Sequence, residues 1–196
     1  MKRIIFTIFD DIKTTTFIEE ANKIKFADYY DKLLSNKKEY AESIGVEFRF
    51  YENSFYDNPY SINVDDEYVG VNLYKLFLLE SLAENYDEVL YVDFDVIFNT
   101  KKNFFEEIDL SKGIAIKDQN LEIIAKDIDH NNIWEMPKRC PTLKYFITKE
   151  LLGGKDNDVI NTGIIGGKAK HIKKLKISKR FNKIKKKIES LKDPIH

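Results

Sequence analysis

The chain has 196 residues, of which 43% are hydrophobic and 33% are charged, and its formal net charge is −1. A single cysteine excludes a disulfide framework and a cysteine-based zinc site, and eight glycines, four prolines and 13% aromatic residues exclude collagen-like and disordered classes. We therefore expect one ordered domain over residues 1–196, long enough to bury its core without a disulfide or a structural metal.

The first predicted element is a buried strand over residues 2–9. Its apolar run is short, ends at the pair Asp10-Asp11 and lacks a small-residue cleavage site, so a strand fits better than a secretory signal peptide. No run approaches the roughly 18 apolar residues of a membrane-spanning helix. Together with the single cysteine, these features lead us to expect a reducing, cytoplasmic location.

A helix, a strand and a second helix are predicted next. Apolar side chains recur at three- and four-residue steps over 26–44, and Gly45 stands where helices commonly end. Apolar and charged residues alternate over 46–51, which is typical of a strand. After a polar loop, the apolar spacing predicts another helix over 65–86.

The rest of the chain continues the alternation of strands and helices. A strand that begins at Val89 is apolar on both faces, as in a buried parallel sheet, and a shorter strand is predicted over 113–116. A helix over 142–152, a last apolar strand over 159–165 and one or two helices over 172–191 follow. The pattern predicts an α/β fold with a mostly parallel central sheet flanked by helices.

The most informative motif lies in residues 91–98, which we interpret as a buried strand interrupted by two carboxylates. Asp93 and Asp95 are one residue apart, so in an extended strand they point the same way, about 7 Å apart, and can meet one ion if the strand end bends. Mg²⁺ and Mn²⁺ prefer such oxygen ligands and commonly bridge carboxylates to a diphosphate. The alternative is that one aspartate caps a loop or pairs with a lysine.

Three segments resemble GT-A fold glycosyltransferases of glycosyltransferase family 8, and they follow one another along the chain in the same order as in that family. Residues 86–96, YDEVLYVDFDV, are similar to the family's Asp-X-Asp strand, and a helix that carries Lys75 precedes them. Residues 6–11, FTIFDD, look like its first strand, whose acidic end approaches the nucleotide. Residues 160–165, INTGII, look like the strand that approaches the donor sugar.

The resemblance implies a Rossmann-like GT-A fold, a nucleotide-sugar donor that is usually a UDP-sugar, and Mn²⁺ or Mg²⁺ bound by Asp93 and Asp95. The positions that it assigns to the nucleotide are Thr7, Asp10, Asp11, Lys75 and Asp93. Other interpretations of these residues stay open. Lys75 also fits an ordinary solvated lysine, and the two N-terminal aspartates also fit caps of the next element.

The sugar and the acceptor are assigned to residues near the later strands. Asn161 and Thr162 carry amide and hydroxyl groups that can bind sugar hydroxyls without adding charge. Asp118 matches a family position near those hydroxyls, and Asp158 is a candidate for acceptor binding or for a general base, so we take these two as the catalytic candidates. The alternative for the loop around Asp158 is a surface turn.

The basic C-terminal tail has two interpretations. Residues 168–196 contain twelve Lys and Arg against two acidic residues, a net of +10, which leaves −11 for residues 1–167. The apolar stripe within 172–191 fits a helix that packs on the sheet, which we favour, and it also fits a helix in peripheral contact with an anionic membrane. We expect no nucleic-acid partner, because aromatic residues are not interleaved with the basic ones.

One feature of the family pattern is missing. The family takes a third metal ligand from a histidine near its C-terminus, but His171 falls too early and His196 is the last residue. A minimal enzyme, a fragment and a chain that has lost activity all fit this difference.

Three functions are therefore considered. The first is a metal-dependent glycosyltransferase acting on a carbohydrate, protein or lipid acceptor. A nucleotidyltransferase is the second, although the Gly-rich phosphate loop expected after its first strand is absent here. The third is a non-catalytic GT-A-like binding domain.

Overall fold

The computed structural model describes residues 1–11, 20–60, 67–118 and 160–190. The chain divides into two compact units, one made of Met1–Ala115 with Gly163–His196 and the other of Ile116–Thr162. The structure describes residues 116–118 and 160–162 of the second unit, which are the ends of two strands. The predicted helix over 142–152 lies outside the described residues.

A five-stranded sheet in the order β2-β1-β3-β5-β4 forms the centre of the fold. The strands are β1 (Arg3–Phe9), β2 (Glu47–Glu52), β3 (Glu88–Val92), β4 (Ile114–Asp118) and β5 (Ile160–Lys168). β1 pairs in parallel with both β2 and β3, whereas β5 runs antiparallel to β3. The α/β class with a central sheet is confirmed, and the antiparallel strand β5 makes the sheet mixed.

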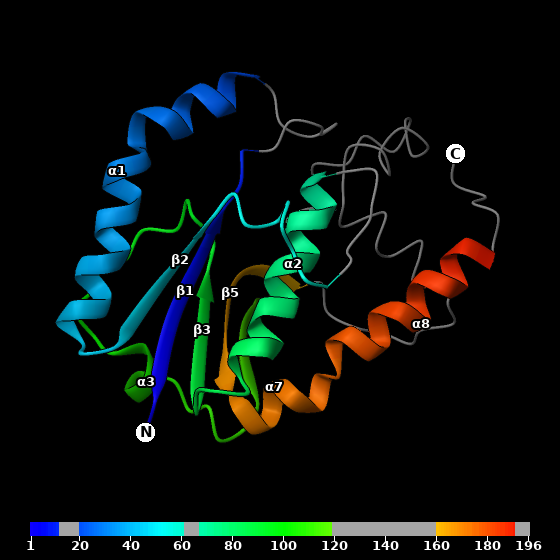
Figure 1. Cartoon of the computed structure of the whole chain (residues 1–196). Coiled ribbons are helices and arrows are strands. Elements are labelled where there is room, and N and C mark those ends of the chain that lie inside the picture. Colours follow the sequence, from blue (N-terminus) through cyan, green and yellow to red (C-terminus); the bar gives the residue numbers. More distant parts are fainter. Residues whose placement is uncertain (12–19, 61–66, 119–159, 191–196) are drawn as a thin grey trace, which may run out of the picture. The chain divides into compact units, whose positions relative to one another are not determined.

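Helices cover both faces of this sheet (Figure 1). The helices are α1 (Glu20–Ser43), α2 (Glu67–Leu82), α3 (Phe104–Glu107), α7 (Ala169–Leu175) and α8 (Ile177–Ser190). Alternate residues of a strand point to opposite faces, and accordingly Phe6 of β1 belongs to the core cluster that contains Leu79 of α2, while Ile5 belongs to the cluster that contains Ala41 of α1. The two clusters fix β1 and β3 between two apolar layers.

Several element boundaries differ from the predicted ones. α1 begins at Glu20 rather than at residue 26. The prediction began too late because residues 20–25 lack the apolar spacing on which it depended. β5 continues to Lys168 rather than ending at 165, through Gly166 and Gly167. Glycine weakens a strand signal in sequence, but here it allows close neighbours: a Cβ at position 166 would lie 2.5 Å from the Phe104 ring.

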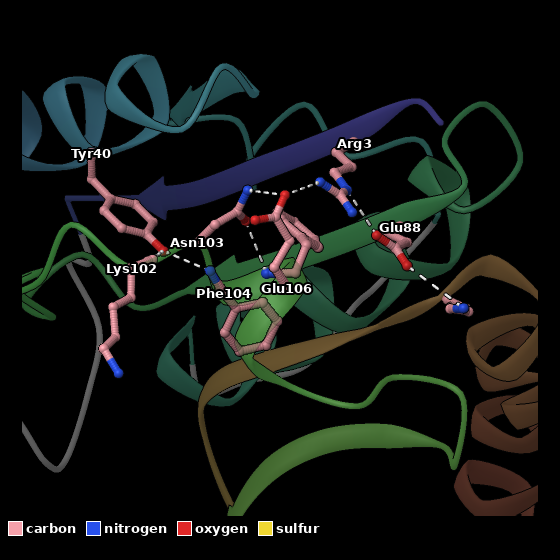
Figure 2. Close-up of polar contacts among 9 residues, drawn as sticks. Arg3, Tyr40, Glu88, Lys102, Asn103, Phe104 and Glu106 are labelled. Carbon is pink, nitrogen blue, oxygen red and sulfur yellow. Dashed lines mark hydrogen bonds and ion pairs between the residues drawn. The ribbon is translucent and has the colours of Figure 1, made fainter.

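The start of β3 was also misjudged. The strand is predicted to begin at Val89, yet it begins at Glu88, which is buried and only 3% exposed. Arg3 of β1 donates to its carboxylate at 2.9 Å, as Figure 2 shows. Lys168 of β5 lies 3.9 Å from its other oxygen. A buried carboxylate is tolerated because cations from the two neighbouring strands compensate its charge.

The basic tail forms two helices, α7 and α8, separated by Lys176 in a left-handed conformation. The carboxylate of Glu80 on α2 accepts hydrogen bonds from the backbone N–H groups of Ile177 and Ser178 at 2.8 and 3.0 Å. It thereby satisfies two of the free donors at the start of α8. Phe181 packs edge-on against Phe77 of α2, so the first turns of α8 pack on the protein, as one of the two interpretations predicts.

In the part of the chain that the structure describes, no helix is long and apolar enough to cross a membrane.

The close approach at Gly166 gives a stability prediction. Gly166→Ala should lower the free energy of unfolding by about 1–3 kcal/mol, because the added methyl group overlaps the Phe104 ring and forces a local shift. Urea unfolding followed by circular dichroism measures the change. Gly113→Ala is the control, since a Cβ there meets nothing within 4 Å. Equal stability of the two variants would contradict the packing described.

Candidate functional site

The Asp93-Phe94-Asp95 motif lies at a turn and not within a strand. β3 ends at Val92, where Asp93 N still donates to Gly163 O at 2.7 Å. Val96 N then donates back to Asp93 O at 3.1 Å, which closes a turn. The continuous strand predicted over 91–98 is therefore wrong beyond Val92, whereas the bend that would let both carboxylates meet one ion is present.

Asp93 is paired with a buried lysine of α2. Lys75 Nζ lies 3.2 Å from Asp93 Oδ1, and the same oxygen accepts a hydrogen bond from the Tyr91 hydroxyl. The Lys75 side chain is 3% exposed, so it is not an ordinary solvated lysine. Burial lowers the pKa of Lys75, and the nearby Asp93 carboxylate opposes that shift. The helix thus holds a cation directly against the first aspartate of the motif.

The second aspartate has a different environment. Asp95 is exposed and makes no hydrogen bond or ion pair with another described residue. Both side-chain contacts of Asp93 fall on Oδ1. The turn therefore offers carboxylate oxygens that the described residues do not use.

A second buried lysine, which sequence reasoning missed, contacts the same turn from the other face of the sheet. Lys37 of α1 is fully buried, and its ammonium donates to the carbonyl oxygens of Phe94 and Val96 at 2.6 and 2.7 Å. Burial lowers the pKa of Lys37 to about 8, against the opposing effect of Asp95 and Asp93. Its sequence signal was its place four residues after Leu33, on the apolar side of the predicted helix.

The end of β1 lies beside this turn. β1 and β3 are adjacent and parallel, so their carboxyl ends meet at one edge of the sheet, and the rings of Phe9 and Phe94 pack there at 4.7 Å. The structure thus places the two predicted acidic segments together, as expected for a site at the carboxyl edge of an α/β sheet.

Polar groups at the end of β1 are buried. Asp10 is 9% exposed, and its Oδ1 accepts from Phe55 N at 3.0 Å. Its Oδ2 and the hydroxyl of Thr7 are buried and have no hydrogen-bond partner among the described residues. Burial raises the pKa of Asp10 to about 6 although the Phe55 N–H bond lowers it. Such unpaired buried oxygens are uncommon and often belong to a functional site.

The structure gives less detail for Asp11 and for the predicted site residues that follow later in the chain. Asp11 is exposed, and its backbone N–H donates to the Asn53 side chain at 2.8 Å. Asp118 ends β4, and Asn161 and Thr162 lie in β5, all three in the second unit. The Asp118 and Asn161 side chains, and the whole of Asp158, lie outside the described part, so the roles of these four residues stay predictions.

The donor set has the chemistry of a hard divalent cation. Asp93 and Asp95 supply carboxylate oxygens, and Mg²⁺ or Mn²⁺ is typically held by one or two carboxylates with substrate phosphates and water. In the described residues, no group of three or more His, Cys, Asp or Glu side chains is placed to hold a metal. His171 does not extend the set, because its Nε2 lies 3.1 Å from Ser111 O.

Comparisons with known proteins support the fold. No family model matches the sequence, and no curated protein matches it. The galactosyltransferase LgtC, solved in complex with donor and acceptor sugar analogues, is similar in structure, with a TM-score of 0.51 and 14% identity over 97% of this chain and 65% of that one.

A glycosyltransferase involved in the glycosylation of the major capsid of PBCV-1 has a TM-score of 0.49 and 16% identity, over 91% of this chain and 64% of that one. The chain thus spans slightly less than two thirds of the length of each of these structures. The structural similarity to the galactosyltransferase shows that the chain has a GT-A glycosyltransferase fold.

The buried Asp10 carboxyl predicts a pH-dependent stability. Its pKa is higher in the folded chain (about 6) than in the unfolded one (3.8), so the contribution of Asp10 to stability is fully present below pH 3.8 and is lost as pH rises through 6. Asp10→Asn should therefore be more stable than the unchanged chain by about 1–3 kcal/mol at pH 7.5. This advantage should shrink towards pH 4.

Chemical unfolding at several pH values measures this difference. Asp11→Asn is the control, because that side chain is exposed. A stability difference between Asp10→Asn and the unchanged chain that is independent of pH would rule out a buried, mostly protonated Asp10 below pH 6.

Proposed function

We propose that the chain is a metal-dependent glycosyltransferase of the family 8 type, which transfers a sugar from a UDP-sugar to a carbohydrate, protein or lipid acceptor. The observation that carries the proposal is the turn at Asp93 and Asp95, with the Lys75 ammonium against Asp93, at the carboxyl edge of a GT-A sheet. Ligands of open α/β sheets bind at this edge.

Asp93 and Asp95 are the residues that would hold Mn²⁺ or Mg²⁺. The ion, when bound with the donor, would supply Lewis-acid stabilisation of the negative charge on the leaving diphosphate. Lys75 keeps one oxygen of Asp93 in a fixed position and adds positive charge beside it. Lys75 lies on α2, and the turn that carries Asp93 and Asp95 directly follows β3, so both parts of the site are attached to regular elements and are held before substrate arrives.

The end of β1 is the proposed nucleotide site. The unpaired oxygens of Thr7 and Asp10 need hydrogen-bond donors, and the N–H of a uracil ring or a ribose hydroxyl would supply them. Asp11 is the exposed residue next to them and is proposed to contact the ribose. Asn161 and Thr162 are proposed to bind the donor sugar. Of the two catalytic candidates, Asp118 is proposed to lie near the sugar hydroxyls, and Asp158 is proposed to bind the acceptor or to act as the general base.

The proposal predicts a metal-dependent ligand effect. UDP with Mn²⁺ should raise the melting temperature of the chain, and Asp95→Asn should remove that rise while leaving the unliganded melting temperature nearly unchanged, because Asp95 is exposed and unpaired among the described residues. Differential scanning fluorimetry with a panel of nucleotide sugars measures this, and Asp28→Asn on α1 is the matched exposed control.

The released product then separates the candidate functions. Release of UDP from a UDP-sugar supports sugar transfer, release of pyrophosphate from a nucleoside triphosphate supports the nucleotidyltransferase, and binding without turnover supports a non-catalytic domain. If no nucleotide binds with Mn²⁺ present, whether UDP, a nucleotide sugar or a nucleoside triphosphate, both enzyme functions are rejected.

We further propose a cytoplasmic location with peripheral membrane contact through residues 172–191. The apolar residues Ile172, Ile177 and Phe181 pack inward, so contact would be electrostatic. Basic side chains cover the solvent-facing side of α7 and the start of α8: Lys170, Lys173, Lys174, Lys176, Lys179, Arg180 and Lys183. A basic surface of this kind attracts anionic lipid headgroups.

Vesicle sedimentation tests this contact. Replacing Lys174, Lys179 and Lys183 by Gln should weaken partition onto phosphatidylserine-containing vesicles on the order of a hundredfold, since each lysine contributes about 1 kcal/mol near such a surface. Lys32, Lys38 and Lys101, replaced in the same way, form the control, because they are exposed elsewhere in the fold. Equal loss in both triple variants, or no sedimentation of the unchanged chain, would reject a specific basic face.

A further inference from the structure

Lys37 has an environment unlike that of any surface lysine. Its side chain is fully buried, and its ammonium donates to three backbone carbonyls, those of Leu33, Phe94 and Val96, at 3.2, 2.6 and 2.7 Å. It also lies 5.2 Å from the centre of the Phe94 ring. An ammonium has three donors, and all three are used.

Burying this charge is costly, so the contacts that compensate it are informative. The Leu33 carbonyl belongs to the same helix and would be present without the lysine. The other two carbonyls belong to the residues on either side of Asp95. The Phe94 carbonyl is part of the peptide group that leads into Asp95, and the Val96 carbonyl follows one residue after it, so Lys37 holds the backbone on both sides of Asp95. No side chain of the motif takes part in these bonds. Lys37 therefore controls the path of the backbone at this turn.

Neighbouring residues of α1 continue the same pattern along the chain. Asn36 donates to Phe98 O and accepts from Phe98 N, at 3.0 and 2.8 Å. The Tyr40 hydroxyl donates to Lys102 O and accepts from Phe104 N, as Figure 2 shows, and its ring stacks on Phe98 at 3.8 Å. One side of α1 thus holds the segment 94–104 by its backbone, and Lys37 holds the part that contains the carboxylate.

We propose that Lys37 is a positioning residue for the carboxylate pair, which holds the Phe94 and Val96 carbonyls so that Asp95 stands beside Asp93 for a divalent cation. The inference rests on the proposed function. Lys75 orders Asp93 through its side chain from α2, whereas Lys37 orders Asp95 through the backbone from α1. The two aspartates are thus fixed independently, from opposite faces of the sheet.

A double-mutant cycle tests this inference, with Mn²⁺ in the presence of UDP as the probe. Electron paramagnetic resonance measures the concentration of free Mn²⁺, and thus the Mn²⁺ affinity, for four proteins: the unchanged chain, Lys37→Met, Asp95→Asn and the double variant. Loss of a group that orients a metal ligand commonly lowers metal affinity about tenfold or more. We expect Lys37→Met to lower the Mn²⁺ affinity about tenfold in the unchanged chain, but less than about twofold in the Asp95→Asn variant. Lys38→Met, at the exposed neighbouring position, is the control.

Hydrogen exchange measured by mass spectrometry supplies a readout that needs no ligand. Lys37→Met should speed exchange in the peptide that contains residues 94–97 and leave β1 and β3 protected. Lys37→Gln, which keeps donors but loses the charge, serves if the methionine variant does not fold, and should give a smaller effect in the same direction.

The outcomes separate the two claims. Equal losses of Mn²⁺ affinity in the presence and absence of Asp95, or unchanged exchange over 94–97, would overturn the role of Lys37. If the unchanged chain binds no Mn²⁺ with UDP, the proposed function fails and the metal role of Lys37 fails with it. The exchange measurement would then still show whether Lys37 orders the turn.

Discussion

The structure of the candidate site depends on how two carboxylates are held at the end of a buried strand. β3 is apolar on both faces and ends at Val92, so Asp93 and Asp95 follow directly from the core. Two buried lysines approach this turn, Lys75 on the side chain of Asp93 and Lys37 on the carbonyls around Asp95. The two carboxylates oppose the effect of burial on these ammonium groups, so each buried lysine has negative charge nearby.

This charge balance has a consequence for ligand binding. A divalent cation that arrives alone would meet two carboxylates already near two ammonium groups, whereas a cation bound to a diphosphate brings its own negative charge. The site is thus better matched to a metal–diphosphate complex than to a free ion. In the proposed donor complex, the phosphates would supply ligands in addition to Asp93 and Asp95.

Much of the fold was predictable because its elements follow simple periodicities. The spacing of the apolar residues predicts the apolar faces of α1 and α2, and it predicts that successive residues of β1 belong to cores on opposite faces of the sheet. Glu88 and the extension of β5 through Gly166 were not predictable. Glu88 is tolerated as a buried residue because Arg3 and Lys168 flank it from other strands. Gly166 leaves room for the ring of Phe104, which comes from far along the chain. Such tertiary contacts leave no local signal.

In the site, too, some features could be predicted from the sequence and others depend on tertiary contacts. The pairing of Asp93 and Asp95 and the proximity of Lys75 follow from motif and helix, and the resemblance to a known family pointed to the end of β1. Lys37 was missed because a lysine in an amphipathic helix is ordinarily assigned to solvent, and only the bend after β3 gives it carbonyl partners. The burial of Asp10 was likewise missed, since the partner of its Oδ1 comes from Phe55, 45 residues later.

The most direct test of the account is the position of Mn²⁺ in crystals of this chain grown with UDP, located by the anomalous scattering of the metal. We predict one anomalous peak, from a Mn²⁺ ion that is bound by the carboxylates of both Asp93 and Asp95 and by the diphosphate. Lys75 should still be paired with Asp93. An ion bound away from both aspartates, or UDP bound away from the carboxyl ends of β1 and β3, would contradict the account.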